Sequence, residues 1–167
     1  HIFSGTVRDN LSMANENLTD ETMVEVLKTV KLWDIFSKAK GLDTVLESQG
    51  KNLSGGQAQR VALARALLYD ASVYIFDEAT SNIDIESEEI ILNIIHSLAK
   101  EKTVIYISHR LPAIKNADCI YVMDKGKVIE SGKHNDLYAK KELYYNMYKH
   151  QEELESYLTK RGETNEK

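Results

Sequence analysis

The sequence predicts an α/β protein in which a mostly helical stretch precedes a mostly parallel β-sheet. Residues 73–76 and 103–107 are short apolar runs of the kind that form buried parallel strands. Between them, residues 87–100 are predicted to form an amphipathic helix whose apolar face consists of Ile90, Ile91, Ile94, Ile95 and Leu98. A strand, a helix and a strand with short links predict a parallel α/β unit, in which ligands bind beyond the carboxyl ends of the strands.

The composition is that of a soluble globular protein. The chain has 167 residues, enough for one domain or a piece of one, and is 43% apolar and 28% charged. No apolar run approaches the ~20 residues that span a bilayer, and the net charge of −5 gives no sign of nucleic-acid binding. Cys119 lies in an apolar run, which predicts a buried thiol, and a single cysteine forms no internal disulfide, which fits a cytoplasmic setting. Because the chain opens at His1 and not at Met, we expect it to be a piece of a longer protein.

The first part of the chain, residues 1–69, is predicted to be a mostly helical subdomain. A short helix is expected to start at Val7, and the stretch Thr19-Asp20-Glu21 caps and charges the start of the next helix. Residues 41–51 are predicted to be a polar loop. A long run of good helix formers follows Ser54 and is expected to close the subdomain.

The second part, residues 70–158, is predicted to be the C-terminal part of an α/β core with helices at its end. Residues 119–123 and 127–130 are expected to form a hairpin, because a short turn containing glycine separates them. Residues 135–158 are predicted to be helical. The charged stretch 159–167 is predicted to be disordered.

The start of the long helix has the features of an anion site. Ser54 is a favoured N-cap residue, and Gly55 and Gly56 carry no side chains, so a ligand can approach the backbone. The first turn of such a helix presents free N–H groups and the positive end of its dipole, which suits a phosphate. The alternative is an ordinary capped helix after a loop, because Ser-Gly-Gly is a common sequence.

Two acidic residues close the apolar run 73–76. Asp77 can hold Mg²⁺, usually through the water shell of the ion. Glu78 suits a general base that orients the water attacking a γ-phosphate. A lone Asp in this place would by default be a solvent-facing acid, but two adjacent carboxylates repel each other unless a cation or a base role occupies them.

Together these features resemble the ATP-binding cassette (ABC) ATPase family. Leu53-Ser54-Gly55-Gly56-Gln57 is similar to the family signature, and Asp77 and Glu78 are similar to the Walker B aspartate and the catalytic glutamate after it. His109, after the apolar run 103–107, resembles the switch histidine that contacts the γ-phosphate, although a lone His at a strand end is more often a surface or core residue. The resemblance implies a partial P-loop NTPase (RecA-type) core with a mostly parallel sheet plus an α-helical signature subdomain, and ATP and Mg²⁺ as cofactors.

Residues 81–84 resemble the D-loop, which in the family crosses to the partner subunit. Ser81 and Asp84 match its pattern, whereas Asn82 and Ile83 depart from the commoner Ala-Leu. A second role for Asp84, compatible with the first, is to cap the helix that follows it.

The resemblance covers residues 1 to about 150. Residues 3–11, and Arg110-Leu111 after His109, are similar to the exporter type of the family. The phosphate-cradling loop G-x-x-x-x-G-K-[ST], or Walker A, has no match in the chain, and the family places it and the Q-loop upstream. The chain thus resembles the C-terminal two thirds of a nucleotide-binding domain. We expect the isolated chain to be inactive, because it lacks the groups that first capture ATP.

In the family, two such domains pair head to tail. Ser54, Gly55 and Gly56 would then serve the nucleotide of the partner, while Asp77 and Glu78, with the histidine, serve their own. The implied partners are a second nucleotide-binding domain and the transmembrane domains of an exporter, fused N-terminally, with no nucleic acid. The implied place is the cytoplasmic side of the cell membrane, in an integral membrane transporter that couples ATP binding and hydrolysis to transport.

Two other functions compete with an exporter ATPase. An ABC-type ATPase of DNA repair needs long heptad runs and basic surfaces, which this acidic chain lacks. A non-catalytic remnant, acting as an interaction module, stays open at this stage.

Overall fold

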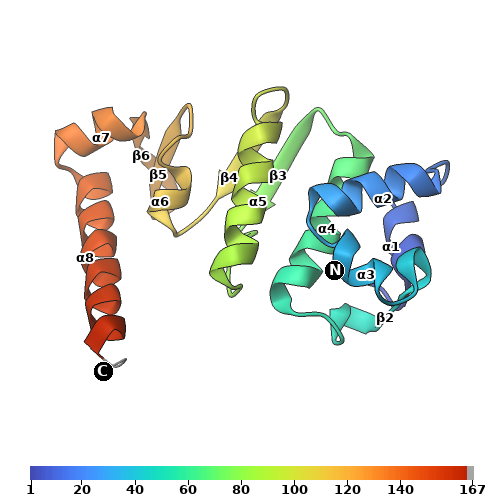
Figure 1. The fold of residues 1–167 in the computed structure, drawn as a ribbon. Helices are drawn as coiled ribbons and strands as arrows, with labels where there is room; N and C mark the ends of the chain where they lie inside the picture. The colour runs from blue at the N-terminus through green and yellow to red at the C-terminus, as the bar shows by residue number, and fades with distance from the viewer. Residues whose placement is uncertain (165–167) are drawn as a thin grey trace. The chain divides into compact units, whose positions relative to one another are not determined.

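The computed structural model describes residues 1–164, which belong to two compact units, His1–Ile107 and Ser108–Lys167 (Figure 1). This division falls at a different point from the boundary expected after residue 69. The long helix α4 (Gly55–Tyr69) packs on helices from both sides of that boundary, so the two parts share one hydrophobic core. Over the described residues, the structure contains no helix with the length and apolarity that a membrane span requires.

Short helices lie near the start of the first unit, and threonine side chains cap the first two of them. They are α1 (Val7–Ser12), α2 (Asp20–Thr29) and α3 (Trp33–Ser37), followed by the 3₁₀ turns η1 (Gly41–Asp43) and η2 (Ser48–Gly50). The Thr19 side chain accepts a hydrogen bond from Thr22 N, so it caps α2 as predicted. Apolar residues at helical spacing in α2 are buried against α4.

The stretch 41–51 is more ordered than the polar loop predicted for it. It contains β2 (Val45–Leu46), which pairs antiparallel with β1 (Gly5–Thr6). Asn52 holds β2 in place, because its Oδ1 accepts from Glu47 N and its Nδ2 donates to Val45 O, both at 2.9 Å. A strand of two residues gives no alternating pattern, so the sequence alone did not indicate it.

The parallel pair predicted from the sequence is present. Strands β3 (Val73–Asp77) and β4 (Thr103–Ile107) are parallel and in register from Val73↔Thr103 to Asp77↔Ile107, and helix α5 (Ile85–Leu98) connects them. Helix α5 starts two residues before the predicted bound because Asp84 is its N-cap.

The sequence predicts that β3 is buried on both faces, and this prediction is wrong for one of them. Tyr74 and Phe76 are buried in the core. The alternate side chains on the two strands are exposed, namely Val73, Ile75, Ile105 and Ile107. Both sets are apolar in the sequence, so the pattern could not distinguish the face that the core of this chain covers.

As far as residue 164, the second unit contains a hairpin and three helices. Its elements are α6 (Leu111–Ile114), β5 (Ile120–Asp124), β6 (Lys127–Gly132), α7 (His134–Lys140) and α8 (Leu143–Thr164). The predicted hairpin is confirmed: β5 and β6 are antiparallel, and Lys125 and Gly126 both have positive φ, as in the type I′ turn that suits a two-residue hairpin loop. Cys119, predicted to be buried, is exposed because it precedes β5 and lies outside its buried positions.

Helix α8 continues to Thr164 and so enters the stretch 159–167 that was predicted to be disordered. The structure differs from that prediction over 159–164. Residues 165–167 lie outside the described part of the chain.

A buried tyrosine organises the core of the second unit. The Tyr144 hydroxyl is hydrogen-bonded to His134 Nδ1 at 2.8 Å, and Tyr144 N donates to Glu130 Oε1 at 3.0 Å. Burial raises the pKa of Tyr144 to about 12, and burial lowers the pKa of His134. The phenol is therefore held neutral well above the pH at which a solvated tyrosine ionises.

This shift predicts a loss of stability in alkaline solution. The unfolded chain releases the Tyr144 proton near pH 10.0, whereas the folded chain keeps it until about pH 12. The free energy of unfolding should therefore fall as the pH rises through that window, by roughly 2–3 kcal/mol for this group. Urea unfolding of the chain at the two ends of the window measures the fall. Tyr144→Phe should remove this part of it, whereas Tyr69→Phe, at an exposed site, should not; equal slopes in both variants would contradict the assignment.

Candidate functional site

The tip of α4 is built as the sequence predicts and lies at the surface. Ser54 Oγ accepts a hydrogen bond from Gln57 N at 3.1 Å, and Gln57 Oε1 accepts from Ser54 N at 3.0 Å, which completes a capping box. Leu53, just before the tip, packs against the core and anchors it. Ser54 and Gly55 are exposed, and within the described residues the amides of Gly55 and Gly56 make no hydrogen bond. Both amides lie at the positive end of a 15-residue helix, where the exposed Gly55 presents a free N–H group and Gly56 is buried.

Gly56 is also required by packing, which the sequence did not indicate. A Cβ atom at this position would collide with Ser87 Oγ and would lie 2.9 Å from Asp84 Oδ2. Both residues belong to the start of α5, where Ser87 is buried. The missing side chain therefore lets the tip of α4 lie directly against the start of α5.

Arg60 connects the tip of α4 to the end of α2 by hydrogen bonds. This arginine is buried, and its guanidinium donates to Gly56 O at 3.3 Å, to Lys31 O at 3.0 Å and to Val30 O at 3.4 Å. The last two carbonyls end α2, where a cation is favoured by the helix dipole. The tip is thus held between α2 and α5.

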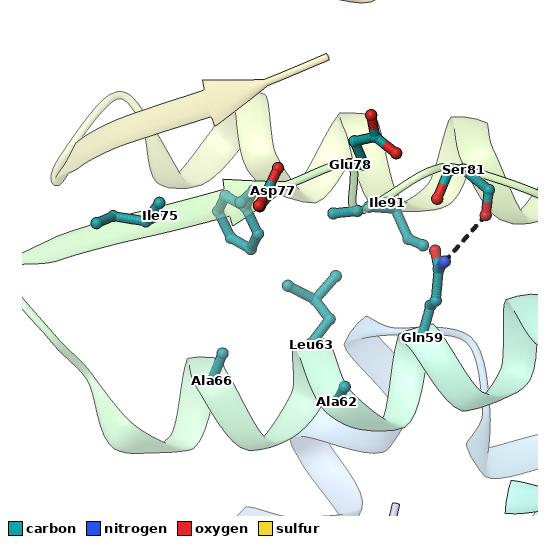
Figure 2. Close-up of a pocket in the computed structure, with 11 residues that line it drawn as sticks. Gln59, Ala62, Leu63, Ala66, Ile75, Asp77, Glu78, Ser81 and Ile91 are labelled. Carbon is teal, nitrogen blue, oxygen red and sulfur yellow. Dashed lines mark hydrogen bonds between the residues drawn. The ribbon is translucent and has the colours of Figure 1, made fainter. Parts of the chain in front are cut away.

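Asp77 and Glu78 lie at the carboxyl end of β3, as predicted, and both line a hollow of about 740 Å³ between β3 and α4 (Figure 2). Glu78 N donates to Ile107 O at 3.0 Å, which extends the contact of β3 with β4 by one residue. Glu78 has φ +49°, a left-handed conformation that is uncommon for a non-glycine residue and that occurs often at functional sites.

The loop after Glu78 is fixed on several sides. The hydroxyls of Thr80 and Tyr106 are hydrogen-bonded at 2.9 Å, which ties the loop to β4. Ser81 N donates to Glu78 O at 3.0 Å. Ser81 O accepts from Gln59 Nε2 at 3.1 Å, which ties the loop to α4 (Figure 2).

Asp84 caps α5, so the second role predicted for it is confirmed. Its Oδ1 accepts from Ser87 N at 2.8 Å, and the hydrogen bonds from Ser87 hold the pKa of Asp84 below its usual value. Asp84 also lines a second hollow, of about 720 Å³, together with Ser54 and Gln57 of the signature tip. The structure therefore brings the predicted D-loop acid beside the signature.

His109 belongs to the second unit, in the segment between β4 and α6. Ser108 Oγ accepts from Arg110 N at 2.9 Å, which turns the chain around His109. Of the predicted site residues, the structure thus brings Leu53, Ser54, Gly55, Gly56, Gln57, Asp77, Glu78, Ser81 and Asp84 into one unit, while His109 lies in the other.

The acids at the end of β3 fit a hydrated magnesium ion. Among the described residues, no three His, Cys, Asp or Glu side chains converge into a metal cage. Mg²⁺ does not need such a cage, because it keeps several waters and is usually held by one or two carboxylates together with substrate phosphates. Asp77 and Glu78, adjacent and exposed beside an open hollow, present that donor set.

Comparison with known proteins decides the family. The family model for ABC transporters matches residues 2–81. An uncharacterized ABC transporter ATP-binding protein of Haemophilus influenzae is 52% identical over 155 residues, which are 93% of this chain and 28% of that protein. The chain belongs to the ABC transporter ATP-binding family.

Other relatives of the ABC family are named as transporters. The ABC multidrug transporter mdr1 of Aspergillus fumigatus is 44% identical over 87% of this chain and 11% of its own length. The alpha-hemolysin translocation ATP-binding protein HlyB of Escherichia coli is 44% identical over 86% of this chain and 20% of its own length. The structure of a bacterial Atm1-family ABC exporter with ATP bound matches with a TM-score of 0.83 and 34% identity, over 90% of this chain and 26% of that one. The P-loop NTPase fold class predicted from the sequence is confirmed, and the chain spans less than a third of the relatives it matches.

Sequence reasoning missed Gln59 and Arg60, although a signal for Gln59 was available. Gln59 shares a helix face with Ala62, Leu63 and Ala66 at i+3, i+4 and i+7. A polar side chain on a face that is otherwise apolar indicates a buried hydrogen bond.

The packing at Gly56 predicts unequal costs for the two signature glycines. Gly56→Ala should lower the free energy of unfolding by about 1–3 kcal/mol, because the new methyl group collides with Ser87 and overpacks the contact between α4 and α5. Gly55→Ala is the matched control. Its Cβ would meet Asn82 O at 3.5 Å, an ordinary contact. Urea unfolding of the two variants checks this, and a Gly55→Ala variant as unstable as Gly56→Ala would contradict it.

Proposed function

We propose that this chain supplies the signature and Walker B parts of the nucleotide-binding domain of an ABC exporter, which couples ATP binding and hydrolysis to transport. The observation that carries the proposal is the pair of separate hollows in the first unit. Ser54, Gln57 and Asp84 line one of them, whereas Asp77 and Glu78 line the other, and the two hollows share no lining residue. One nucleotide cannot use both sets of groups in the same copy.

A head-to-tail pair of copies uses both sets at each nucleotide. In our proposal, the amides of Gly55 and Gly56 and the hydroxyl of Ser54 bind the terminal phosphate of ATP held by the partner. The dipole of α4 favours the negative charge, and the capping box keeps the tip rigid, so that little reorganisation accompanies binding.

The acids of β3 act on the nucleotide of their own copy. Glu78 accepts a proton from the attacking water and orients it, and its left-handed backbone fixes the direction of its side chain. Asp77 would hold Mg²⁺ through its water shell, and the bound ion would supply positive charge next to the phosphates. His109 contacts the γ-phosphate and helps to place it for attack.

The proposed partners follow from the relatives. The names of the matched proteins include a multidrug transporter, a hemolysin translocation ATP-binding protein and an Atm1-family exporter. We propose that transmembrane domains in the same polypeptide or complex are the moving parts, that a second nucleotide-binding domain is the dimer partner, and that the chain works at the cytoplasmic side of the membrane.

A chimera tests the activity. The region of E. coli HlyB that matches this chain is replaced by this chain, so that the residues before it supply the phosphate-binding loop. We expect the chimera to hydrolyse Mg-ATP, whereas the isolated chain should show no turnover, because it has no phosphate-binding loop.

Replacing the proposed base should abolish most of this activity. Glu78→Gln in the chimera should lower kcat by about 10²- to 10⁴-fold, the range for loss of a general base, with ATP binding retained. The control is Glu153→Gln, the same chemical change at an exposed position of α8. Steady-state phosphate release measures both variants, and a Glu78→Gln chimera with the activity of the control would refute the assignment.

A further inference from the structure

One side chain connects the signature helix to the loop that follows the β3 acids. Gln59 lies on α4, five residues after Ser54, and reaches across to Ser81 (Figure 2). Its Nε2 donates to Ser81 O at 3.1 Å, a contact between residues 22 positions apart. The same side chain lines the hollow that contains Asp77 and Glu78.

The hydrogen bonding of Gln59 is not what a purely stabilising residue would show. Its Oε1 is buried and, within the described residues, has no hydrogen-bond partner. A buried acceptor without a partner costs free energy, and an apolar side chain of the same shape would avoid that cost. Rotating the amide would bring Oε1 against Ser81 O, two acceptors together, so the carbonyl of Ser81 fixes the orientation of the amide.

The elements at the two ends of this contact have no freedom to move independently. Gln59 and the signature tip belong to consecutive turns of one helix, and the capping box makes the tip part of that helix. At the other end, Ser81 N is bonded to Glu78 O, so Ser81 is connected to the proposed base by one hydrogen bond. A displacement of the tip is therefore passed through Gln59 to the loop that positions Glu78.

We propose that Gln59 is a positioning residue that couples the two half-sites of one copy, the signature tip that serves the nucleotide of the partner and the Walker B acids that serve its own. The proposal rests on the proposed function. It assigns to Gln59 an effect on both nucleotides of a dimer, exerted through the helix and the loop that its hydrogen bond joins.

The test uses the HlyB chimera in mixed dimers in which one copy carries Gln59→Met and the other copy is unsubstituted. Methionine keeps the length of the side chain and removes the donor. One site of each dimer is silenced by Glu78→Gln, placed in either copy, so that the site of the substituted copy and the site of its partner are measured separately. Gln49→Met, at an exposed position, is the matched control.

We expect both sites to slow by about three- to tenfold, the range that the net contribution of one hydrogen bond gives. The KM for ATP should stay unchanged, because the substitution leaves the amides of the tip and the carboxylates of Asp77 and Glu78 in place. Slowing of one site alone would show that Gln59 acts locally and would overturn the coupling, as would activity equal to that of Gln49→Met.

A second measurement on the chain itself keeps the test decisive. Hydrogen exchange of the backbone amides at 79–83 should be faster by about three- to tenfold in Gln59→Met than in the unsubstituted chain. Unchanged exchange would overturn the positioning role even if the chimera is inactive. An unsubstituted chimera that hydrolyses no ATP, with faster exchange in the variant, would instead count against the proposed function and leave the contact of Gln59 established.

Discussion

The site depends on the direct contact between the tip of α4 and the start of α5. Only a residue without a side chain fits where Gly56 approaches Ser87 and Asp84. This contact places the tip beside the acid that caps α5, and Ser54, Gln57 and Asp84 then line one hollow. The two glycines therefore have different functions: Gly56 lets the two helices meet, whereas the exposed Gly55 leaves the backbone open to a ligand.

The contacts around the tip explain why a surface feature is nevertheless rigid. Arg60 joins Gly56 O to the end of α2, and Gln59 joins the same helix to the loop after β3. Thr80 holds the far side of that loop on β4. An anion site built from backbone amides binds well only if those amides are already oriented, because orienting them at the time of binding costs conformational entropy.

The sequence was sufficient for the parts of the fold that local rules decide. The cap of α4 at Ser54, the strand that ends at Asp77 and the hairpin turn at Lys125-Gly126 are each encoded by a few adjacent residues. Features that depend on distant residues were not predictable. The two-residue strand at Val45–Leu46 exists only because another strand pairs with it, and the burial of one face of β3 depends on which face the core covers.

The same distinction holds for the site. The residue types at the tip and at the end of β3 indicated phosphate and magnesium chemistry, but their arrangement in two separate hollows required the structure. That arrangement has a consequence for catalysis. Different faces of α4 line the two hollows, so the groups around them cannot close on the same phosphate, because the helix lies between them. In the proposed dimer, each copy supplies one of the two sets to each site, so that association with a second copy completes both sites. In that dimer, the coupling that we propose through α4 would link the two nucleotides, because this helix carries both the signature tip and Gln59.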